Sequence, residues 1–192
     1  MDGSLDGNAA EAETVAAAMA GDREAFSQLV HAHGQAVHAF LARRAGRPTA
    51  DELLTEVWLR AWRSRGGYDP EWPDPRPWLY GIARNVLRAH WRLRTDGSRP
   101  AFQLAEDPWP AVDDRIDAGR LGRTLAEALA GLGDDYREVL LLVAWEQLRP
   151  SEVAVTLGLS ASTVRSRLHR ARQILQRAID ATTPQHPIFQ EA

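Results

Sequence analysis

Apolar residues in the first half of the chain recur every three to four positions, which is the spacing of one face of an α-helix. Asp22 follows a glycine that interrupts the first of these segments, and it has the side chain of a helix N-cap. Thr49 and Glu52 have the spacing of a capping box, and Pro77 is of a type favoured in the first turn of a helix. Residues 1–10 are mostly Gly, Asp, Asn and Ala and are expected to be disordered. The predicted helices cover residues 11–44, 49–65 and 77–94.

Proline dominates the stretch between the last two of these helices. Four prolines stand in the nine residues from Asp69 to Pro77. Each proline fixes its own backbone and disfavours helix in the residue before it, so this stretch is predicted to be a stiff, extended loop. A second stretch, residues 96–115, is rich in Pro, Gly, Asp and Ser and is predicted to be a flexible linker between two domains.

The second half of the chain has a helix-turn-helix pattern. A short amphipathic segment ends at Gly158, and Ser160 then caps a longer segment in which Val164, Leu168 and Ala171 recur at core spacing. The predicted helices cover residues 116–130, 134–147, 150–157 and 160–180. No strand pattern is found. The predicted fold is therefore all-α, with two small helical domains, residues 11–95 and 116–180, joined by the linker and followed by a tail, residues 181–192.

The face of the last helix opposite these core positions is polar and basic. Its side chains are of the types that bind base edges in the major groove or phosphates of the backbone. The candidate DNA-binding residues are Ser162, Thr163, Arg165, Ser166, His169, Arg170, Arg172 and Gln173. Base edges are within reach of Ser162, Arg165, Ser166, His169 and Gln173. Phosphate contacts are expected from the arginines toward the flanks, which are Arg167, Arg170 and Arg172. An arginine-rich helix that is merely solvated agrees less well with the turn, the cap and the core spacing.

The net charge is −3, and all 23 basic residues are arginine. The charged residues are distributed unevenly along the chain. Six arginines and one acid fall in residues 76–99, and five arginines and no acid fall in residues 163–177. Residues 100–140, between these blocks, hold nine acids and four arginines. Two basic blocks separated by an acidic one indicate two places that contact phosphate.

Several function classes are excluded by what the sequence lacks. There is no cysteine, which excludes disulfides, thiolate zinc sites and thiol redox switches. Phosphate-binding loops, dinucleotide glycine motifs and a nucleophile elbow are also missing. His31 and His33 fall on different faces of a helix, so neither a metal site nor a cofactor is expected. No secretory signal or membrane span is found, and a cytoplasmic protein is expected.

One run in the second half resembles a known family. Residues 135–142 read DYREVLLL, residues 151–160 read SEVAVTLGLS and residues 163–172 read TVRSRLHRAR. This run resembles region four of the extracytoplasmic-function (ECF) sigma factors of the sigma-70 superfamily. The resemblance implies that the helix-turn-helix reads the minus-thirty-five promoter element and that the chain contacts the polymerase flap. Ser162 stands where the family often has Gly, and Arg149 where it usually has a capping Ser or Thr.

A run in the first half resembles region two of the same family, since residues 53–62 read LLTEVWLRAW and residues 78–85 read WLYGIARN. The resemblance implies docking on the clamp coiled coil of the polymerase's largest subunit and capture of the minus-ten element as a single strand. The candidate polymerase-binding residues are Asp51, Glu52, Glu56 and Arg60. The candidate residues for the downstream element are Asp69, Arg76, Arg84, Asn85, Arg88, Trp91 and Arg92. Ala89 stands where the family commonly has Asp, so the downstream promoter sequence is not inferred from relatives.

The chain is therefore predicted to bind core RNA polymerase and promoter DNA, both duplex and single-stranded, with no catalytic residues of its own. The resemblance also implies an anti-sigma factor as a partner. Two alternatives stay open at this point. A conventional helix-turn-helix regulator would bind duplex DNA alone as a dimer, and a nucleic-acid enzyme would modify DNA without polymerase. Co-purification with core polymerase and run-off transcription distinguish them.

Overall fold

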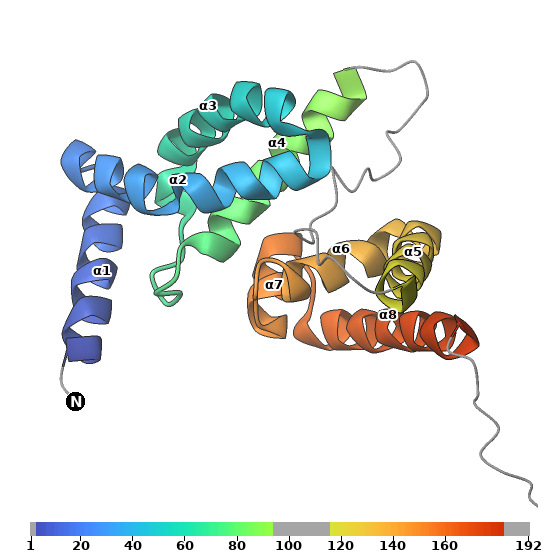
Figure 1. The fold of residues 1–192 in the computed structure, drawn as a ribbon. Coiled ribbons are helices and arrows are strands. Elements are labelled where there is room, and N and C mark those ends of the chain that lie inside the picture. The colour runs from blue at the N-terminus through green and yellow to red at the C-terminus, as the bar shows by residue number, and fades with distance from the viewer. Residues whose placement is uncertain (1–2, 94–115, 183–192) are drawn as a thin grey trace, which may run out of the picture. The chain divides into compact units, whose positions relative to one another are not determined.

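A computed structural model describes residues 3–93 and 116–182, in which every regular element is a helix (Figure 1). The all-α fold predicted from the sequence is thereby confirmed for these ranges. The chain forms two compact units, one of Met1–Glu106 with Ala154–Leu159 and the other of Asp107–Val153 with Ser160–Ala192. The predicted linker, residues 96–115, and residues 183–192 of the predicted tail lie outside the described residues. The predicted domain boundaries stay a prediction.

Within residues 3–93, the first unit has four α-helices and one short 3₁₀ helix. They are α1 (Gly3–Ala20), α2 (Arg23–Ala45), α3 (Arg47–Ser64), η1 (Arg65–Gly67) and α4 (Arg76–Leu93). α2 packs against α1, α3 and α4, and α1 also contacts η1 (Figure 1). The side chains that are no more than 1% exposed in α2, α3 and α4 are apolar. They include Val37, Phe40, Leu41, Val57, Leu79, Val86 and Leu87.

The corner between α1 and α2 follows the sequence prediction. Gly21 has φ +104°, a left-handed conformation that glycine adopts without steric cost. The Oδ1 of Asp22 then accepts hydrogen bonds from the backbone N–H groups of Glu24 and Ala25, at 2.8 and 3.0 Å. These bonds satisfy two of the N–H groups that a helix start leaves without partners, so Asp22 is the N-cap of α2.

Two predictions about this unit are wrong. α1 begins at Gly3, where the sequence pattern predicted disorder over residues 1–10. The segment is followed by alanine-rich chain, and alanine has the highest helix propensity, so the helix extends toward the terminus. α3 begins at Arg47, two residues before the predicted cap Thr49, and no side chain caps it. Gly46 turns the chain with φ +79° and Pro48 fits the first helical turn, so the backbone itself starts α3.

The second unit contains α5 (Ile116–Gly131), α6 (Asp134–Ala144) and α8 (Ala161–Thr182), with α7 (Pro150–Leu157) directly before α8 along the chain. α8 packs against both α5 and α6. Leu129, Leu132 and Ala171 are buried where these helices meet. α6 ends three residues before its predicted end at Gln147, which has a positive φ of 56°.

Arg137 closes the end of α5. Its guanidinium donates hydrogen bonds to the backbone carbonyls of Leu129 at 2.7 Å and Ala130 at 2.6 Å, and also to that of Leu132. A helix C-terminus leaves carbonyl groups without partners and carries a partial negative charge, so the half-buried Arg137 stabilises it. None of the helices in residues 3–93 and 116–182 is both long and apolar enough to cross a lipid bilayer.

Candidate nucleic-acid interface

The start of α8 is fixed by Ser160. Its Oγ accepts a hydrogen bond from the backbone N–H of Thr163 at 3.1 Å, which is the N-cap contact that the sequence predicted. The same oxygen lies 2.9 Å from the Oγ of Ser162 and 2.8 Å from the Oγ1 of Thr163. Three hydroxyl groups are thus gathered at the N-terminal end of the helix, where its dipole favours contact with an anion such as a phosphate.

α8 separates a buried face from a polar one. Val164, Leu168 and Ala171 are at most 6% exposed and hold the helix against its own unit. At about 100° per residue, six of the eight predicted DNA-binding residues of α8 lie on the other side of the helix, and Arg165 and Arg172 lie at the edge between the two faces. Thr163 and Gln173 are half-buried and the other six are exposed.

The centre and the flanks of this face differ in chemistry. Its central line consists of Ser162, Ser166, His169 and Gln173, which follow one another at intervals of three or four residues. The Nε2 atoms of His169 and Gln173 are 3.0 Å apart and hydrogen-bonded, so these two side chains are aligned along the helix. Arg165 and Arg172 lie on one flank and Arg170 lies on the other. The third arginine expected on a flank, Arg167, is half-buried and its Nη2 lies 2.8 Å from the Asp135 carboxylate of α6.

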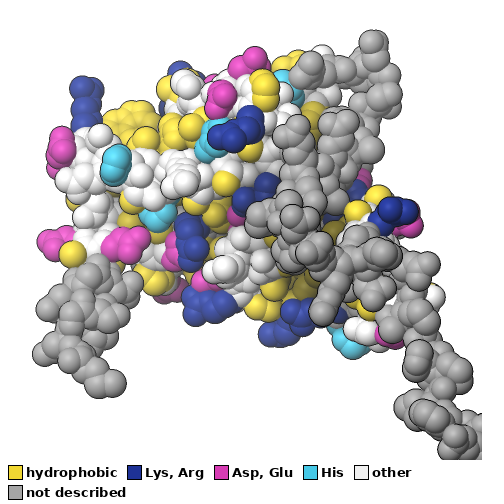
Figure 2. Space-filling model, in the orientation of Figure 1, with side chains coloured by type: hydrophobic (Ala, Val, Ile, Leu, Met, Phe, Trp, Pro, Cys, Tyr) yellow, Lys and Arg dark blue, Asp and Glu magenta, His cyan; other side chains and the backbone are white. Residues whose placement is uncertain are grey.

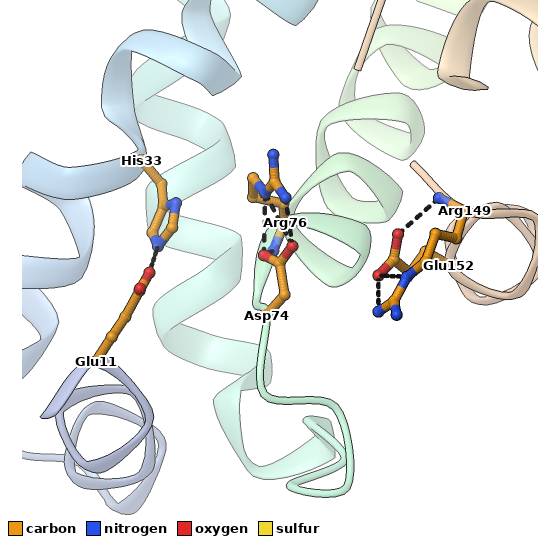
Figure 3. A network of polar contacts seen from close by, with 6 residues as sticks. All are labelled: Glu11, His33, Asp74, Arg76, Arg149 and Glu152. Carbon is orange, nitrogen blue, oxygen red and sulfur yellow. Dashed lines mark hydrogen bonds and ion pairs between the residues drawn. The ribbon is translucent and has the colours of Figure 1, made fainter. Parts of the chain in front are cut away.

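α7, the first helix of the helix-turn-helix, begins with an ion pair (Figure 3). The Glu152 side chain, which is 5% exposed, accepts hydrogen bonds from the Arg149 backbone N–H at 2.7 Å and from the Arg149 Nε at 2.8 Å. The Arg149 Nη2 also donates to this carboxylate. Glu152 therefore reaches back to cap the helix start, as the acidic half of a capping box does. This contact supplies the cap at the position where the sequence has Arg149 in place of Ser or Thr.

Helix α4 presents a second set of predicted DNA-binding residues. Five of them fall within a sector of about 120° around the helix axis. They are Arg84, Asn85, Arg88, Trp91 and Arg92. Arg84 and Trp91 are half-buried and the other three are exposed. The opposite side of the helix is in the core, because Ala83, Val86 and Leu87 are at most 1% exposed.

The other two predicted residues, Asp69 and Arg76, are not part of this sector. Arg76 lies eight residues before Arg84, which is roughly 12 Å along the helix axis. Its guanidinium holds the Asp74 carboxylate, with Nη2 2.7 Å from Oδ2 and Nε 2.9 Å from the same oxygen (Figure 3). Asp69 is exposed in the loop before α4, where its Oδ1 accepts the N–H of Glu71 at 3.0 Å.

His33 of α2 is buried close to this loop. Its Nε2 is 3.7 Å from the Oε1 of Glu11 on α1 (Figure 3). Burial lowers the pKa of His33 below its usual value, although the carboxylates of Glu11 and Asp74 act to raise that pKa. No group of three or more metal-ligating side chains is found in the part of the chain that the structure describes.

The predicted polymerase-binding residues lie on α3. Asp51 and Glu52 are exposed and Glu56 is half-buried. The Nε of Arg60 donates to the Oε1 of Glu56 at 2.6 Å. The Asp51 carboxylate is 2.7 Å from the Nε2 of His38, which joins α3 to α2. The structure thus brings all four predicted residues to one helix.

Apolar side chains accompany these charges. Leu59 is 42% exposed, unusually for a large aliphatic residue. Phe26 of α2 makes edge-on ring contacts with Trp58 and Trp62 of α3, with centroids 6.2 and 5.0 Å apart, and all three rings are half-buried. In Figure 2, hydrophobic side chains gather over the end of the first unit where α1, α2 and α3 meet, with charged side chains around them. An apolar area with a charged rim is typical of protein interfaces.

The sequence matches two protein families, Sigma-70 region 2 over residues 29–96 and Sigma-70, region 4 over residues 122–175. RNA polymerase sigma factor CnrH of Cupriavidus metallidurans is 32% identical to this chain, over 91% of this chain and 97% of CnrH. The chain belongs to the ECF sigma factors. ECF RNA polymerase sigma factor SigM of Mycobacterium tuberculosis is 33% identical, over 88% of this chain and 84% of SigM. A structure of CnrH in complex with the cytosolic domain of CnrY aligns with a TM-score of 0.62 and 28% identity, over 91% of this chain and 99% of that chain.

Membership of this family decides among the alternatives. A sigma factor binds core RNA polymerase and directs promoter-specific initiation, while the polymerase performs the chemistry. The prediction that the chain is not an enzyme is confirmed by its family. The conventional dimeric regulator and the nucleic-acid enzyme are both set aside.

Some residues around the sigma factor's sites were not selected from the sequence. Asp74, which binds Arg76, precedes a proline, and an aspartate followed by proline is a common signal for the start of a turn or helix. Tyr68, whose hydroxyl donates to the Trp72 carbonyl, has no local signal, because its partner is defined only once the loop is folded. The pairing of His38 with Asp51 joins residues 13 positions apart and is equally invisible to helix periodicity.

Proposed function

We propose that α8 reads the upstream, minus-thirty-five element of the promoter as duplex DNA. The observation that carries this proposal is the face of α8 opposite Val164 and Leu168, where a line of neutral hydrogen-bonding side chains is flanked by arginines. Serine, histidine and glutamine side chains can contact base edges in the major groove, and the arginines reach bases or phosphates. Their place at the start of the second helix of a helix-turn-helix is where base contacts are made in that motif.

We further propose that α4 and the loop before it capture the minus-ten element as a single strand. Arg84, Arg88 and Arg92 recur every four residues, so they can follow the phosphates of one strand. Trp91 lies in the same sector and offers a ring on which a base can stack. Asn85 adds a neutral donor and acceptor beside these charges.

The third part of the proposal is that α3 docks on the clamp coiled coil of the polymerase. Glu52 and Glu56 lie on the same side of α3 as the exposed Leu59, which places charged groups beside an apolar anchor. Because it works with RNA polymerase, we propose that the sigma factor acts in the cytoplasm.

Reconstitution with core polymerase tests the docking. The double variant Glu52→Arg with Glu56→Arg should bind core polymerase at least about tenfold more weakly, since two favourable charges become repulsive. Its helix content should stay the same, because the lost Glu56 to Arg60 pair contributes only about 0.3–0.5 kcal/mol. Glu127→Arg, an exposed reversal on α5, is the matched control. Unchanged polymerase affinity with unchanged circular dichroism would show that docking uses another face.

We also propose that an anti-sigma factor restrains this protein. The support is the CnrH structure, which is a complex with the cytosolic domain of CnrY. Expression of the chain alone in a heterologous host with a cognate promoter reporter tests the idea. Restraint predicts that co-expression of a neighbouring reading frame reduces the reporter signal. Full activity that no neighbouring frame alters would indicate control at the level of synthesis.

A further inference from the structure

Tyr68 holds the first half of the loop between η1 and α4 in a turn. The Tyr68 hydroxyl donates to the backbone carbonyl of Trp72, and the Trp72 N–H donates to the Asp69 carbonyl at 3.1 Å. Burial raises the pKa of Tyr68 to about 12, so the hydroxyl stays protonated and remains a donor at physiological pH. The chain from residue 68 to residue 72 is therefore folded back on itself by two hydrogen bonds.

The Tyr68 ring connects this turn to the rest of its unit. It lies edge-on to the ring of Trp78 in α4, with centroids 5.5 Å apart and planes at 75°. It also packs against a buried cluster where α1 meets α2. The cluster consists of Val15, Ala18, Ala25 and Leu29. Tyr68 thus fixes the position of the loop relative to α1, α2 and α4.

Asp74 holds the second half of the loop. Its carboxylate accepts the backbone N–H of Arg76 at 2.9 Å and the guanidinium of the same residue at 2.7–3.1 Å. Burial alone would raise the pKa of Asp74, but the hydrogen bonds from Arg76 outweigh burial and lower that pKa. Asp74 is accordingly ionised at physiological pH and keeps its charge-assisted bonds.

The chain between these two anchors is exposed. Asp69, Pro70, Glu71 and Pro73 are all exposed, and only Trp72 among residues 69–73 is half-buried. Proline restricts its own φ and the conformation of the residue before it. Residues 69–73 therefore form a short exposed tip. The prolines and the contacts of Tyr68 and Asp74 leave its backbone little freedom to change conformation.

We propose that Tyr68 and Asp74 are positioning residues, which fix the shape of the tip and thereby set which unstacked base of the downstream element it accepts. The inference rests on the proposed function of α4 and this loop as the site for single-stranded promoter DNA. A preorganised loop loses little conformational entropy when it binds. A rigid loop also rejects a base of the wrong shape, because it cannot rearrange around that base. Neither anchor needs to contact DNA itself.

The test uses the holoenzyme on a promoter whose downstream element is held open by mismatches. All four bases are compared at each position of the strand, and the half-saturating DNA concentration is measured for each. Tyr68→Phe keeps the ring and removes one hydrogen bond, so discrimination at one position should fall about fivefold. Asp74→Asn removes a charged acceptor, and the same position should lose about tenfold. Affinity at the other positions and the maximal rate should stay as in the wild type.

Tyr136→Phe is the matched control, because it makes the same change in a half-buried tyrosine of the second unit. Rescue is informative too: Tyr68→Phe should retain more discrimination than Tyr68→Ala. Equal losses at every position for Tyr68→Phe, or none at all, would overturn the inference while leaving the single-strand site intact. A wild-type holoenzyme that shows no base preference at any downstream position would overturn the proposed function and the inference together.

Discussion

The two helices proposed to face DNA, α4 and α8, differ in the types of side chain on their exposed sides. The centre of the α8 face is neutral, with Ser162, Ser166 and Gln173 around His169, and its arginines stand on the flanks. The α4 face is formed by three arginines and a tryptophan, with Asn85 as its one neutral polar residue. Duplex DNA is read through hydrogen bonds to base edges, whereas a single strand is held through its phosphates and by stacking. The difference between the faces therefore matches the difference between the proposed targets.

The comparison also indicates where each site obtains its selectivity. On α8, the residues proposed to select a base lie on the helix itself, and the cap at Ser160 and the buried Val164 fix their position. On α4, arginine and tryptophan contacts tolerate any sequence. Under this proposal, selectivity for the downstream element comes largely from outside the helix, and the anchored loop before α4 is the nearest structured candidate.

The largest expected effect separates base readers from phosphate contacts on α8. Arg165→Ala and His169→Ala should each weaken use of the cognate upstream element by about 1–3 kcal/mol, since a good base contact has that value. Arg172→Ala should weaken binding to all sequences alike and reduce its dependence on salt. Binding of holoenzyme to cognate and scrambled upstream elements over a range of salt concentrations provides the measurement. Equal losses on both elements for all three variants would refute this division of roles.

A smaller effect is expected on α4. The double variant Arg88→Ala with Arg92→Ala should lower the slope of log affinity against log salt for single-stranded DNA by about 1.4, at about 0.7 for each phosphate contact. The loss should be the same for any base sequence, in contrast to that of Arg165→Ala on the duplex. Fluorescence anisotropy of a labelled single strand with holoenzyme measures both slope and sequence dependence. A loss confined to one sequence would place base reading on α4 itself.

The helices that place these faces were largely predictable from the sequence. Helical periodicity, Asp22, Gly158 and Ser160 gave most element boundaries to within three residues, because these signals are local. Thr49 failed as a cap because the glycine and proline at the start of α3 act through the backbone at the same place. Both basic faces were also predicted, because residues three or four positions apart in the sequence lie on the same side of a helix.

The contacts that hold the sites in shape were not predictable in the same way. Tyr68, His33 and Arg137 act through partners on other elements or on backbone atoms whose positions depend on the whole fold. A pattern of residue types does not specify such pairs. Glu152 is an intermediate case, because its spacing from Arg149 suits a capping box but the sequence lacks the usual Ser or Thr.

Removal of the α8 cap should have a modest effect that is specific to the upstream site. Ser160→Ala removes the acceptor of the Thr163 N–H and should cost the second unit about 1 kcal/mol of stability. It also frees the hydroxyls of Ser162 and Thr163, so upstream discrimination should decrease while single-strand binding is unchanged. Urea unfolding and binding to the two DNA forms provide the measurements. Ser27→Ala, an exposed serine within α2, is the control and should leave both unaltered.

The smallest effect concerns pH and distinguishes the units that carry α4 and α8. Burial lowers the pKa of His33, and the nearby charged groups of Glu11, Asp74 and Arg76 change that pKa without reversing the direction. The unfolded chain, where histidine has a pKa of about 6.5, therefore takes up a proton before the folded unit does. Stability from neutral His33 is complete above about pH 6.5 and is lost as pH falls toward the lower pKa of the folded state. Asp74, whose pKa is also lowered, contributes stability that is lost only below about pH 3.9, so the two groups act in separate windows.

Urea unfolding at pH 7.5 and pH 5.5, followed by amide signals of each unit, measures this loss. The first unit should be less stable at pH 5.5, with a slope of at most about 1.4 kcal/mol per pH unit, the limit for one proton. His33→Gln should remove that part of the pH dependence, and His31→Gln, an exposed neighbour on α2, should retain it. Because His33 lies beside the Asp74 anchor, acidification should relax downstream discrimination before it affects upstream recognition by α8. An equal loss of stability in both units, or one that His33→Gln leaves in place, would show that the buried histidine is not the group that responds.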